Sequence, residues 1–214
     1  MSSSVCEKRQ FFLFKLLKLF NESFDMYKLR RFTALNFVFF EKIVANLTRL
    51  IPLYILFYEE MIKEEIEFAD ISKNDKVLHI GSGTIPATGI IICQKTNADI
   101  TGIDINSESI KKSKIVIEKK FKSLNLRVKL ADGANIDVSE YNKIIISDGI
   151  NDLLKILTNI SKSSKKGSIV ILRKTIKNDA FELDNDGLNK NFDVKKISKH
   201  PFYGDLSSIM LVKK

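Results

Sequence analysis

The stretch that decides the fold runs from Val77 to Thr88 and reads Val-Leu-His-Ile-Gly-Ser-Gly-Thr-Ile-Pro-Ala-Thr. A short apolar strand leads into a glycine turn and then into the start of a helix. A second short strand follows and ends in Asp104, 21 positions after Gly83. In doubly wound α/β domains, glycines at such a turn let the backbone approach a ligand, and the carboxylate accepts hydrogen bonds from ribose hydroxyls. The sequence therefore predicts a pocket for a nucleoside.

The loop departs from the dinucleotide-binding fingerprint at its third glycine. In the pattern G-x-G-x-x-G that position falls on Pro86. The missing glycine normally permits close packing of helix and strand, with a pyrophosphate at the helix N-terminus. A ligand without a pyrophosphate therefore fits better than NAD or FAD. We expect Thr84 to cap the next helix, Pro86 to lie in its first turn, and Asn106 or Ser107 to cap the helix after Asp104.

Strand and helix patterns alternate from residue 71 onward. We expect strands at 76–80, 99–104, 126–131, 143–147, 168–174, about 192–198 and about 207–213, and helices at 86–96, 107–123 and 150–162. Short connections between alternating elements predict a mostly parallel sheet with right-handed crossovers. The last two strands enclose a turn-like linker and are predicted to form a closing hairpin. The expected fold of residues 71–214 is a Rossmann-like, doubly wound α/β domain with a seven-stranded sheet.

Residues 1–70 are much richer in aromatic side chains and hold eleven of the fifteen phenylalanines. Apolar residues recur there at helical spacing, the last run extending from near Pro52 to about Ala69. We expect an N-terminal helical segment with three alternative roles: a lid over the pocket, a homodimer interface, or contact with a membrane surface through residues 8–20. Charged residues interrupt residues 34–57, so no membrane-spanning helix is predicted.

The net charge of +9 lies wholly in residues 71–214, because residues 1–70 hold ten basic and ten acidic side chains. Lysines filling exposed positions account for this charge, and a nucleic-acid partner is the alternative. Few aromatic side chains accompany these lysines, and acidic residues are scattered among them, which argues against nucleic acid. Two distant cysteines, Cys6 and Cys93, and the lack of an export signal lead us to expect a cytoplasmic protein without a metal site.

The order of these motifs resembles that of the class I S-adenosylmethionine-dependent methyltransferases, over roughly residues 70–214. This resemblance implies S-adenosylmethionine as the cofactor. The cofactor contacts that it implies are His79, Gly81, Ser82, Gly83, Asp104, Ile105, Asp132, Gly133 and Asp148. Asp104 would bind the ribose hydroxyls, Asp132 would lie beside the adenine, and Asp148 would lie near the transferred group. A second interpretation stays open: Asp132 and Asp148 are turn or cap residues, and His79 is a core histidine.

The loop from Gly81 to Thr88 is also similar to that of nicotianamine synthase and its microbial relatives. In that family Gly-Ser-Gly is followed by an apolar residue, proline, any residue and threonine. The resemblance implies the same fold and cofactor, with transfer of the aminobutyrate arm instead of the methyl group. It also implies an N-terminal helical domain over the pocket.

Methyl transfer from a sulfonium depends mainly on aligning the nucleophile with the methyl carbon. A general base is needed only where the nucleophile holds a proton, and the candidate catalytic residues are Asp148, His200 and Tyr203. The Asp/Asn-Pro-Pro-aromatic signature of DNA amino-group methylation is absent at residues 147–150. We therefore expect a methyltransferase acting on a small molecule. The alternatives are an aminobutyrate transferase and a non-catalytic cofactor-binding or scaffold protein.

Overall fold

The structure is a computed structural model that describes residues 51–176, 188–203 and 205–214. The chain divides into two compact units, residues 1–42 and 43–214, and every described residue belongs to the second unit. The helices expected before residue 50, with the proposed membrane-contact and homodimer surfaces, lie outside the described residues. Within the described ranges, no helix is long and apolar enough to cross a membrane.

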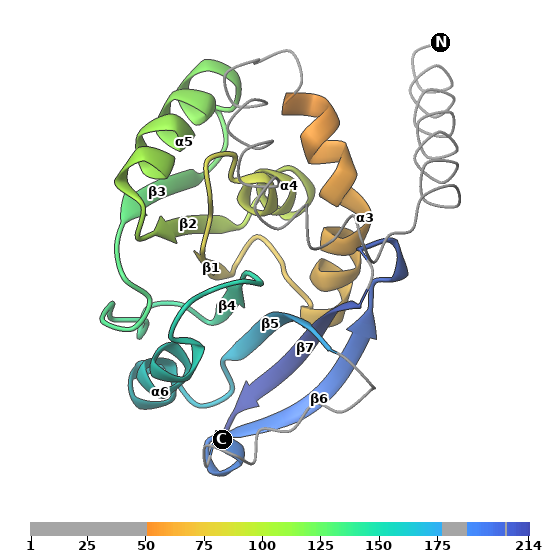
Figure 1. Ribbon diagram of the computed structural model, residues 1–214, viewed down its shortest axis with the longest axis vertical. Coiled ribbons are helices and arrows are strands. Elements are labelled where there is room, and N and C mark those ends of the chain that lie inside the picture. The colour runs from red at the N-terminus through yellow and green to blue at the C-terminus, as the bar shows by residue number, and fades with distance from the viewer. Residues whose placement is uncertain (1–50, 177–187, 204) are drawn as a thin grey trace. The chain divides into compact units, whose positions relative to one another are not determined.

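Seven strands form one sheet in the order β3-β2-β1-β4-β5-β7-β6 (Figure 1). Their bounds are β1 (Lys76–Ile80), β2 (Asp99–Asp104), β3 (Leu126–Leu130), β4 (Lys143–Ile146), β5 (Ile169–Thr175), β6 (Phe192–Lys199) and β7 (Leu206–Lys213). The strands from β3 to β5 pair in parallel, and β7 pairs antiparallel with both β5 and β6. The predicted mostly parallel sheet with a closing hairpin is therefore confirmed.

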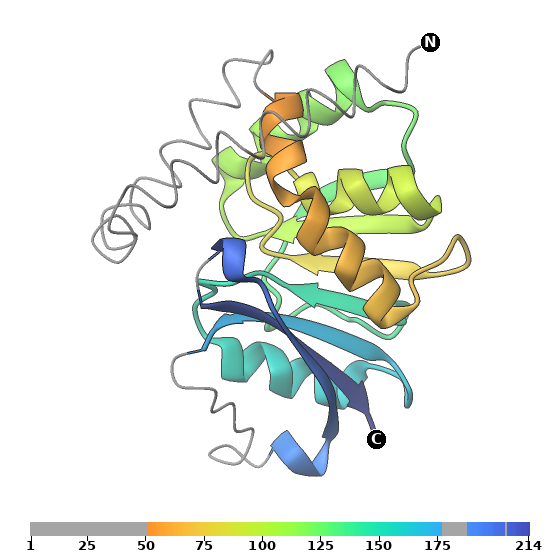
Figure 2. The same ribbon diagram turned by 90° about the vertical axis from the view of Figure 1, so that its right-hand side faces the viewer.

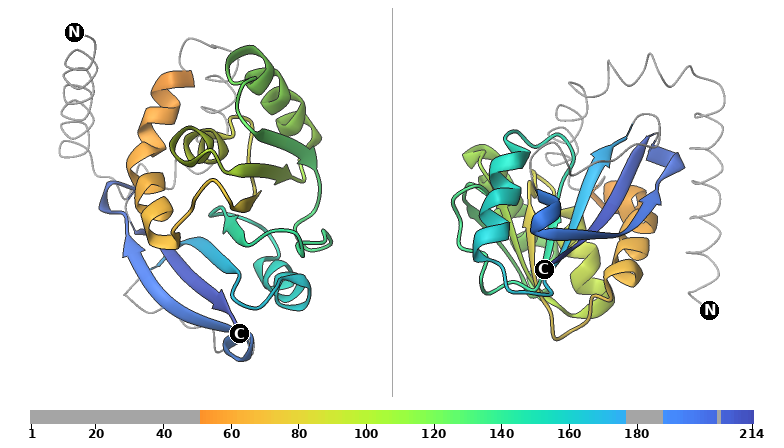
Figure 3. Two further views of the ribbon diagram at one scale, coloured as in Figure 1. Left: turned by 180° about the vertical axis from the view of Figure 1, so that it is seen from behind. Right: turned by 90° about the horizontal axis from the view of Figure 1, so that it is seen from below.

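Helices cover both faces of the sheet (Figures 2 and 3). One face carries α3 (Ile51–Ala69), α4 (Ala87–Thr96) and α5 (Ser107–Lys120), and the other carries α6 (Leu153–Ser163). Two short 3₁₀ turns, η2 (Leu188–Lys190) and η3 (Pro201–Tyr203), flank β6. Helix α3 begins and ends close to the bounds predicted for the last N-terminal helix, and it packs on α4, β5 and β7.

The central strands β4 and β5 contain continuous apolar runs because both faces of the sheet are covered there. Val77 and Ile145 pack under α3 and α4, whereas Leu78 and Ile146 pack toward α6. The chain winds from β1 outward to β3 and then returns to β4 on the other side of β1. Open α/β sheets bind ligands at such a reversal, at the carboxyl ends of the strands. We call the ends of β1 to β5 on this side, with the adjoining residues of β7, the carboxyl edge.

Two of the helix starts differ from the sequence predictions. Pro86 is the N-cap of α4, and no side chain caps this helix, so the prediction that Thr84 caps it was wrong. Helix α6 begins at Leu153 instead of residue 150, because Gly149 (φ +75°) and Asp152 (φ +55°) adopt left-handed backbone conformations that a right-handed helix cannot contain.

Helix α5 starts as predicted but ends early. The side chain of Asn106 accepts hydrogen bonds from the Glu108 and Ser109 amides, which confirms the expected cap. The helix ends at Lys120, three residues before the predicted end, and Phe121 leaves the helical conformation.

Candidate functional site

The glycine loop after β1 is bound closely to the end of β2. Gly81 and Gly83 have φ values of +82° and +67°, a conformation that residues with a side chain rarely adopt. The amides of Gly81 and Ser82 both donate to the Ile103 carbonyl at 2.9 Å. A Cβ atom on Gly81 would also lie 3.1 Å from Ser147 Cβ and 2.6 Å from Ile150 Cδ1, so a side chain there would be strained by the backbone conformation and would crowd its neighbours. The loop therefore presents bare backbone at the carboxyl edge.

Asp104 is held in place by two backbone amides. Gly83 donates to its Oδ2 at 2.9 Å, and Asn106 donates to its Oδ1 at 2.8 Å. Each carboxylate oxygen has a second lone pair, so the half-buried Asp104 can still accept hydrogen bonds from a ligand. The next residue, Ile105, is 67% exposed, so its apolar side chain is open to a ligand beside Asp104. Gly83, Asp104 and Ile105 are thus adjacent, as the resemblance implied.

The loop after β3 also reaches this edge. A Cβ atom on Gly133 would lie 2.8 Å from Ile80 Cγ2, so this loop passes directly against the end of β1. Asp132 uses both of its oxygens within its own turn: it accepts from the Ala134 amide at 2.9 Å and from the Asn135 side chain at 2.7 Å. Each Asp132 oxygen thus keeps a second lone pair, as the oxygens of Asp104 do, while Gly133 marks the close approach of the two loops.

His79 lies beneath the glycine loop and does not open onto it. His79 is 4% exposed and bonds through Nε2 to Ser147 Oγ at 2.9 Å, and Ser147 donates its hydroxyl hydrogen to the Gly81 carbonyl at 2.9 Å. Because that hydrogen is used on Gly81, Nε2 must carry the ring proton. Burial, with a smaller contribution from the charge of Arg173, lowers the pKa of His79 to about 3. His79 is therefore a neutral donor that supports the loop from below through Ser147.

Ser82, the remaining loop residue among the predicted contacts, is buried. Its side chain faces β2, where a Cβ atom on Gly102 would lie 2.9 Å from Ser82 Cβ. Its backbone stays at the carboxyl edge between the two glycines. Any contact of Ser82 with a ligand in this arrangement would therefore involve its backbone.

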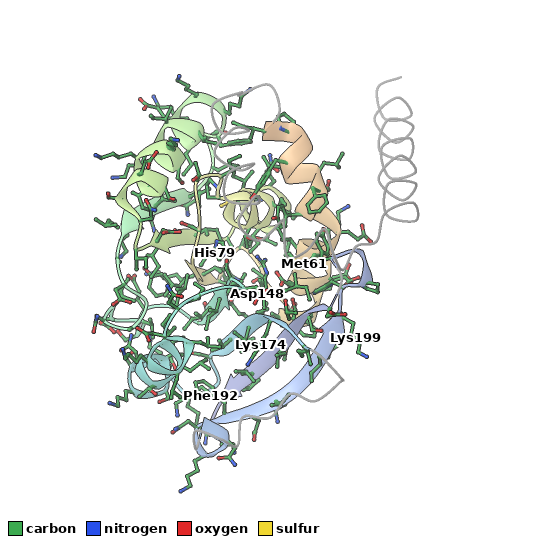
Figure 4. The ribbon with its side chains drawn as sticks, in the orientation of Figure 1. Met61, His79, Asp148, Lys174, Phe192 and Lys199 are labelled. Carbon is green, nitrogen blue, oxygen red and sulfur yellow. The ribbon has the colours of Figure 1, made fainter. Side chains whose placement is uncertain are left out.

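Asp148 is exposed directly after β4, on the strand next to the one that carries His79 (Figure 4). Thr175, at the end of β5, donates to its Oδ2 at 2.9 Å. This contact joins the ends of β4 and β5 and fixes one oxygen of the carboxylate. Asp148 therefore lies at the carboxyl edge, on the side away from Asp104.

His200 and Tyr203 are both directed toward α3. His200 is 4% exposed and bonds to Ser208 Oγ at 2.8 Å, and its Nδ1 lies 3.2 Å from a Glu64 oxygen. Burial lowers the pKa of His200, against the raising effect of the nearby glutamates. The Tyr203 hydroxyl donates to the Phe57 carbonyl, and burial raises the pKa of Tyr203. These contacts hold both side chains in the packing between η3, β7 and α3.

The sequence interpretation missed a buried group of polar side chains between α3, α4 and β5. Arg173 donates from Nε and Nη2 to the two oxygens of Glu65, at 2.8 and 2.6 Å, and from Nη1 to Thr88 Oγ1 at 3.0 Å. Glu65 is 1% exposed and Arg173 is 6% exposed. The signal that pointed to this group was an arginine following four apolar residues in a strand, and it did not indicate the partners.

The described residues contain no group of three or more histidine, cysteine, aspartate or glutamate side chains that could hold a metal ion. Cys93 is a free, buried cysteine. Burial raises the pKa of its thiol to about 12, so it stays protonated at neutral pH.

A family model described as "Methyltransferase domain" matches residues 71–204, which is more than half of the chain. Comparison with curated proteins gave no match. A solved structure of an MtNAS mutant in complex with S-adenosylmethionine is 19% identical, with a TM-score of 0.64, and the match covers 73% of this chain and 62% of that one. In this match the chain spans less than two thirds of the length of the MtNAS mutant.

Two further solved structures come from named organisms. The RNA methyltransferase from Salinibacter ruber in complex with S-adenosyl-L-homocysteine has a TM-score of 0.55 at 16% identity and covers 72% of this chain and 92% of that one. A putative sarcosine dimethylglycine methyltransferase from Galdieria sulphuraria has a TM-score of 0.60 at 13% identity, with coverage of 73% and 84%. At such identities, these likenesses show a shared fold and nothing more.

Proposed function

Because the chain belongs to the methyltransferase-domain family, we propose that it is an S-adenosylmethionine-dependent methyltransferase that acts on a small molecule. The observation that carries the cofactor assignment is the position of Asp104. Its carboxylate is fixed by the amides of Gly83 and Asn106 at the end of β2, and it keeps lone pairs for two adjacent hydroxyls. Ribose presents such a pair of hydroxyls.

The other residues at this edge fit the rest of a nucleoside. Ile105 and Leu130 are 67% and 57% exposed at the ends of β2 and β3, and they offer apolar surface to a purine ring. The glycine loop offers bare backbone to the chain that extends from the ribose. The residues present therefore fit S-adenosylmethionine, which supplies a carbon activated by its sulfonium. The fit requires no pyrophosphate, in agreement with Pro86 in place of the third glycine.

For the transfer step, the chain offers Asp148 as a proton acceptor. It is exposed at the end of β4, and the Thr175 hydroxyl fixes one of its oxygens. A carboxylate positioned in this way can accept a proton from an amine or hydroxyl nucleophile. Residues 147–150 lack the Asp/Asn-Pro-Pro-aromatic signature of DNA amino-group methylation, which supports a small acceptor over a nucleic acid.

The loop sequence favours a second candidate, transfer of the aminobutyrate arm of the same cofactor. Residues Gly81 to Thr88 contain Gly-Ser-Gly and, after Thr84, the apolar, Pro, x, Thr order that resembles the loop of nicotianamine synthase. The two reactions leave different products. Methyl transfer leaves S-adenosylhomocysteine, and aminobutyrate transfer leaves methylthioadenosine.

Calorimetric titration tests both candidates directly. The full chain is titrated with S-adenosylmethionine, S-adenosylhomocysteine, methylthioadenosine and NAD, beside the variants Asp104→Ala and Asp137→Ala. Asp137 is the matched control, since it also bonds a nearby backbone amide, that of Ser139, but lies away from the glycine loop. We expect micromolar binding of the first two ligands, about a hundredfold weaker in Asp104→Ala because two hydrogen bonds to a charged group are lost. Asp137→Ala should bind as the wild type does.

The pattern of ligands separates the candidates. A preference for methylthioadenosine over S-adenosylhomocysteine would favour aminobutyrate transfer. Binding of NAD alone, or of none of the four ligands, would overturn the assignment of Gly81 to Asp104 as the cofactor site. Binding without release of either by-product, across a panel of small amines and hydroxy compounds, would support a non-catalytic cofactor-binding protein.

A further inference from the structure

Helix α4 begins without a cap of its own. Pro86 occupies the N-cap position and makes no side-chain hydrogen bond to the first turn. The first four N–H groups of an α-helix have no partner inside the helix, so a helix start usually relies on a capping side chain. The start of α4 follows directly on the glycine loop. Whatever fixes this turn therefore also fixes one end of the proposed cofactor loop.

The contact that fixes this turn comes from another part of the chain. Thr88, in the first turn of α4, is 4% exposed, and its Oγ1 accepts a hydrogen bond from Arg173 Nη1 of β5 at 3.0 Å. The same guanidinium binds both oxygens of Glu65 on α3. We call these three residues the Glu65–Arg173–Thr88 latch. The latch joins the start of α4 to a strand and to a second helix.

The geometry of the latch is rigid. A guanidinium bound to a carboxylate by two parallel hydrogen bonds is held in one plane and one orientation. Glu65 is held in turn by the Ser208 hydroxyl, which donates to its Oε1 at 2.6 Å. The contacts with α3 and β7 therefore set the direction of the remaining Nη1–H bond. The Thr88 hydroxyl must lie in that direction to accept the hydrogen bond.

A buried ion pair contributes little net stability compared with apolar packing of similar volume. Its distinctive property is that it defines one arrangement of the elements that it joins. Arg173 lies at the same level of the sheet as the start of the glycine loop. Its neighbour Leu172 pairs with Ile146, and Ile146 pairs with Ile80, the residue before Gly81. The latch thus lies level with Ser147 and Gly81, at the carboxyl edge.

We propose that Thr88, Arg173 and Glu65 are positioning residues for the cofactor site. The latch holds the first turn of α4, and with it the glycine loop, in the geometry that the cofactor requires. Helix α3 contributes to cofactor binding through this latch without contacting the cofactor. The inference rests on the proposed function, because it assumes that the loop binds S-adenosylmethionine or its product.

Two substitutions at Thr88 test the latch while leaving the ion pair intact. Thr88→Val keeps the shape of the side chain and removes the hydroxyl, whereas Thr88→Ser keeps the hydroxyl. The dissociation constant for S-adenosylhomocysteine is measured by calorimetry on the full chain, well below the unfolding midpoint. We expect about tenfold weaker binding in Thr88→Val, because the first turn of α4 is no longer held and part of the binding free energy is spent on ordering the glycine loop. Thr88→Ser should restore the binding.

Thr96→Val is the matched control, at the other end of α4. The Thr96 hydroxyl donates to the Ile92 carbonyl at 2.8 Å and accepts from the Ala98 amide at 3.1 Å, so its loss weakens the helix without touching the latch. We expect a lower unfolding midpoint and an unchanged dissociation constant. This control separates a general loss of stability from a displaced loop.

The outcomes distinguish the latch from the function on which it rests. If the wild type does not bind S-adenosylhomocysteine, the proposed function is overturned, and the role of the latch with it. If the wild type binds and Thr88→Val binds equally well, the latch alone is overturned. Weaker binding in Thr96→Val, by the same factor as in Thr88→Val, would also overturn it.

Discussion

The two halves of the carboxyl edge are held together in different ways. At the ends of β2 and β3, Asp104 and Asp132 each accept a hydrogen bond from a backbone amide two residues further along the chain. At the end of β5 and the start of β7, the partners are distant in sequence: Arg173 and Glu65 are 108 positions apart, and Ser208 and Glu65 are 143 apart. The first half is organised by local turns, and the second depends on the whole domain being folded.

The largest loss of stability should come from a substitution in the half whose hydrogen-bond partners are distant in sequence, which we call the remote half. Glu65→Gln removes the charge opposite the buried Arg173, and an uncompensated buried charge destabilises a protein by about 3–5 kcal/mol. Urea unfolding, followed by circular dichroism, measures this loss. Glu59 is the matched control on the same helix, because it pairs with Lys63 and Lys95 at the surface. Glu59→Gln should lower stability by about 1 kcal/mol or less, and equal losses in both variants would contradict the contrast.

A smaller loss of stability should appear at acidic pH, and it should come from His79, which supports the glycine loop through Ser147. The pKa of His79 falls from 6.5 to about 3 on folding. Between these values the unfolded chain binds a proton that the folded chain does not, so stability falls as the pH drops from 6.5 toward 3. The expected slope is on the order of 1.4 kcal/mol per pH unit.

His79→Gln provides the comparison for this prediction, because glutamine keeps a donor for Ser147 and does not titrate. Unfolding free energies of the wild type and the variant are measured from pH 7 to pH 4. Other groups titrate in both proteins, so the difference between the two curves isolates His79. Below about pH 6.5, we expect the free energy of unfolding of the wild type to fall progressively relative to that of His79→Gln. Curves that stay parallel from pH 7 to pH 4 would contradict a buried, neutral His79.

The smallest effect should come from the contact between Thr175 and Asp148, which lies at the surface of the remote half. A double-mutant cycle of Thr175→Val and Asp148→Ala measures the coupling between the two side chains. We expect about 0.5–1 kcal/mol, typical of one hydrogen bond in water. Strictly additive losses would mean that Thr175 does not hold the Asp148 carboxylate.

The contrast between the halves explains what could be predicted from the sequence. The strands, their mostly parallel pairing with a closing hairpin and the cap at Asn106 were predicted from local patterns, and the structure confirms them. The expected positions of Gly83 and Asp104 side by side follow from the strand–loop–helix order, because parallel neighbours end at the same edge. The prediction of Thr84 as a helix cap failed, since its hydroxyl bonds to Ser109 on α5 instead.

The latch could not be predicted in this way. Nothing near Arg173 in the sequence indicates that Glu65 lies opposite, because the sign of a charge does not identify its partner. The catalytic role of His200 and Tyr203 stays a prediction, but their contacts with Ser208 and Phe57 could not be predicted from their place in a linker. Their orientation depends on where α3 packs, and helical periodicity alone does not specify that.

The position of β7 has a consequence for how the chain folds. β7 follows β6 in the sequence but lies between β5 and β6 in the sheet. The hairpin of β6 and β7 involves short-range contacts and can form early, whereas pairing of Ile169 with Val212 must close a long loop. The edge of β5 therefore stays unpaired until the hairpin docks. During that interval β5 is the strand most exposed to pairing with another chain, so we expect slow refolding and aggregation at high concentration to have a common origin there.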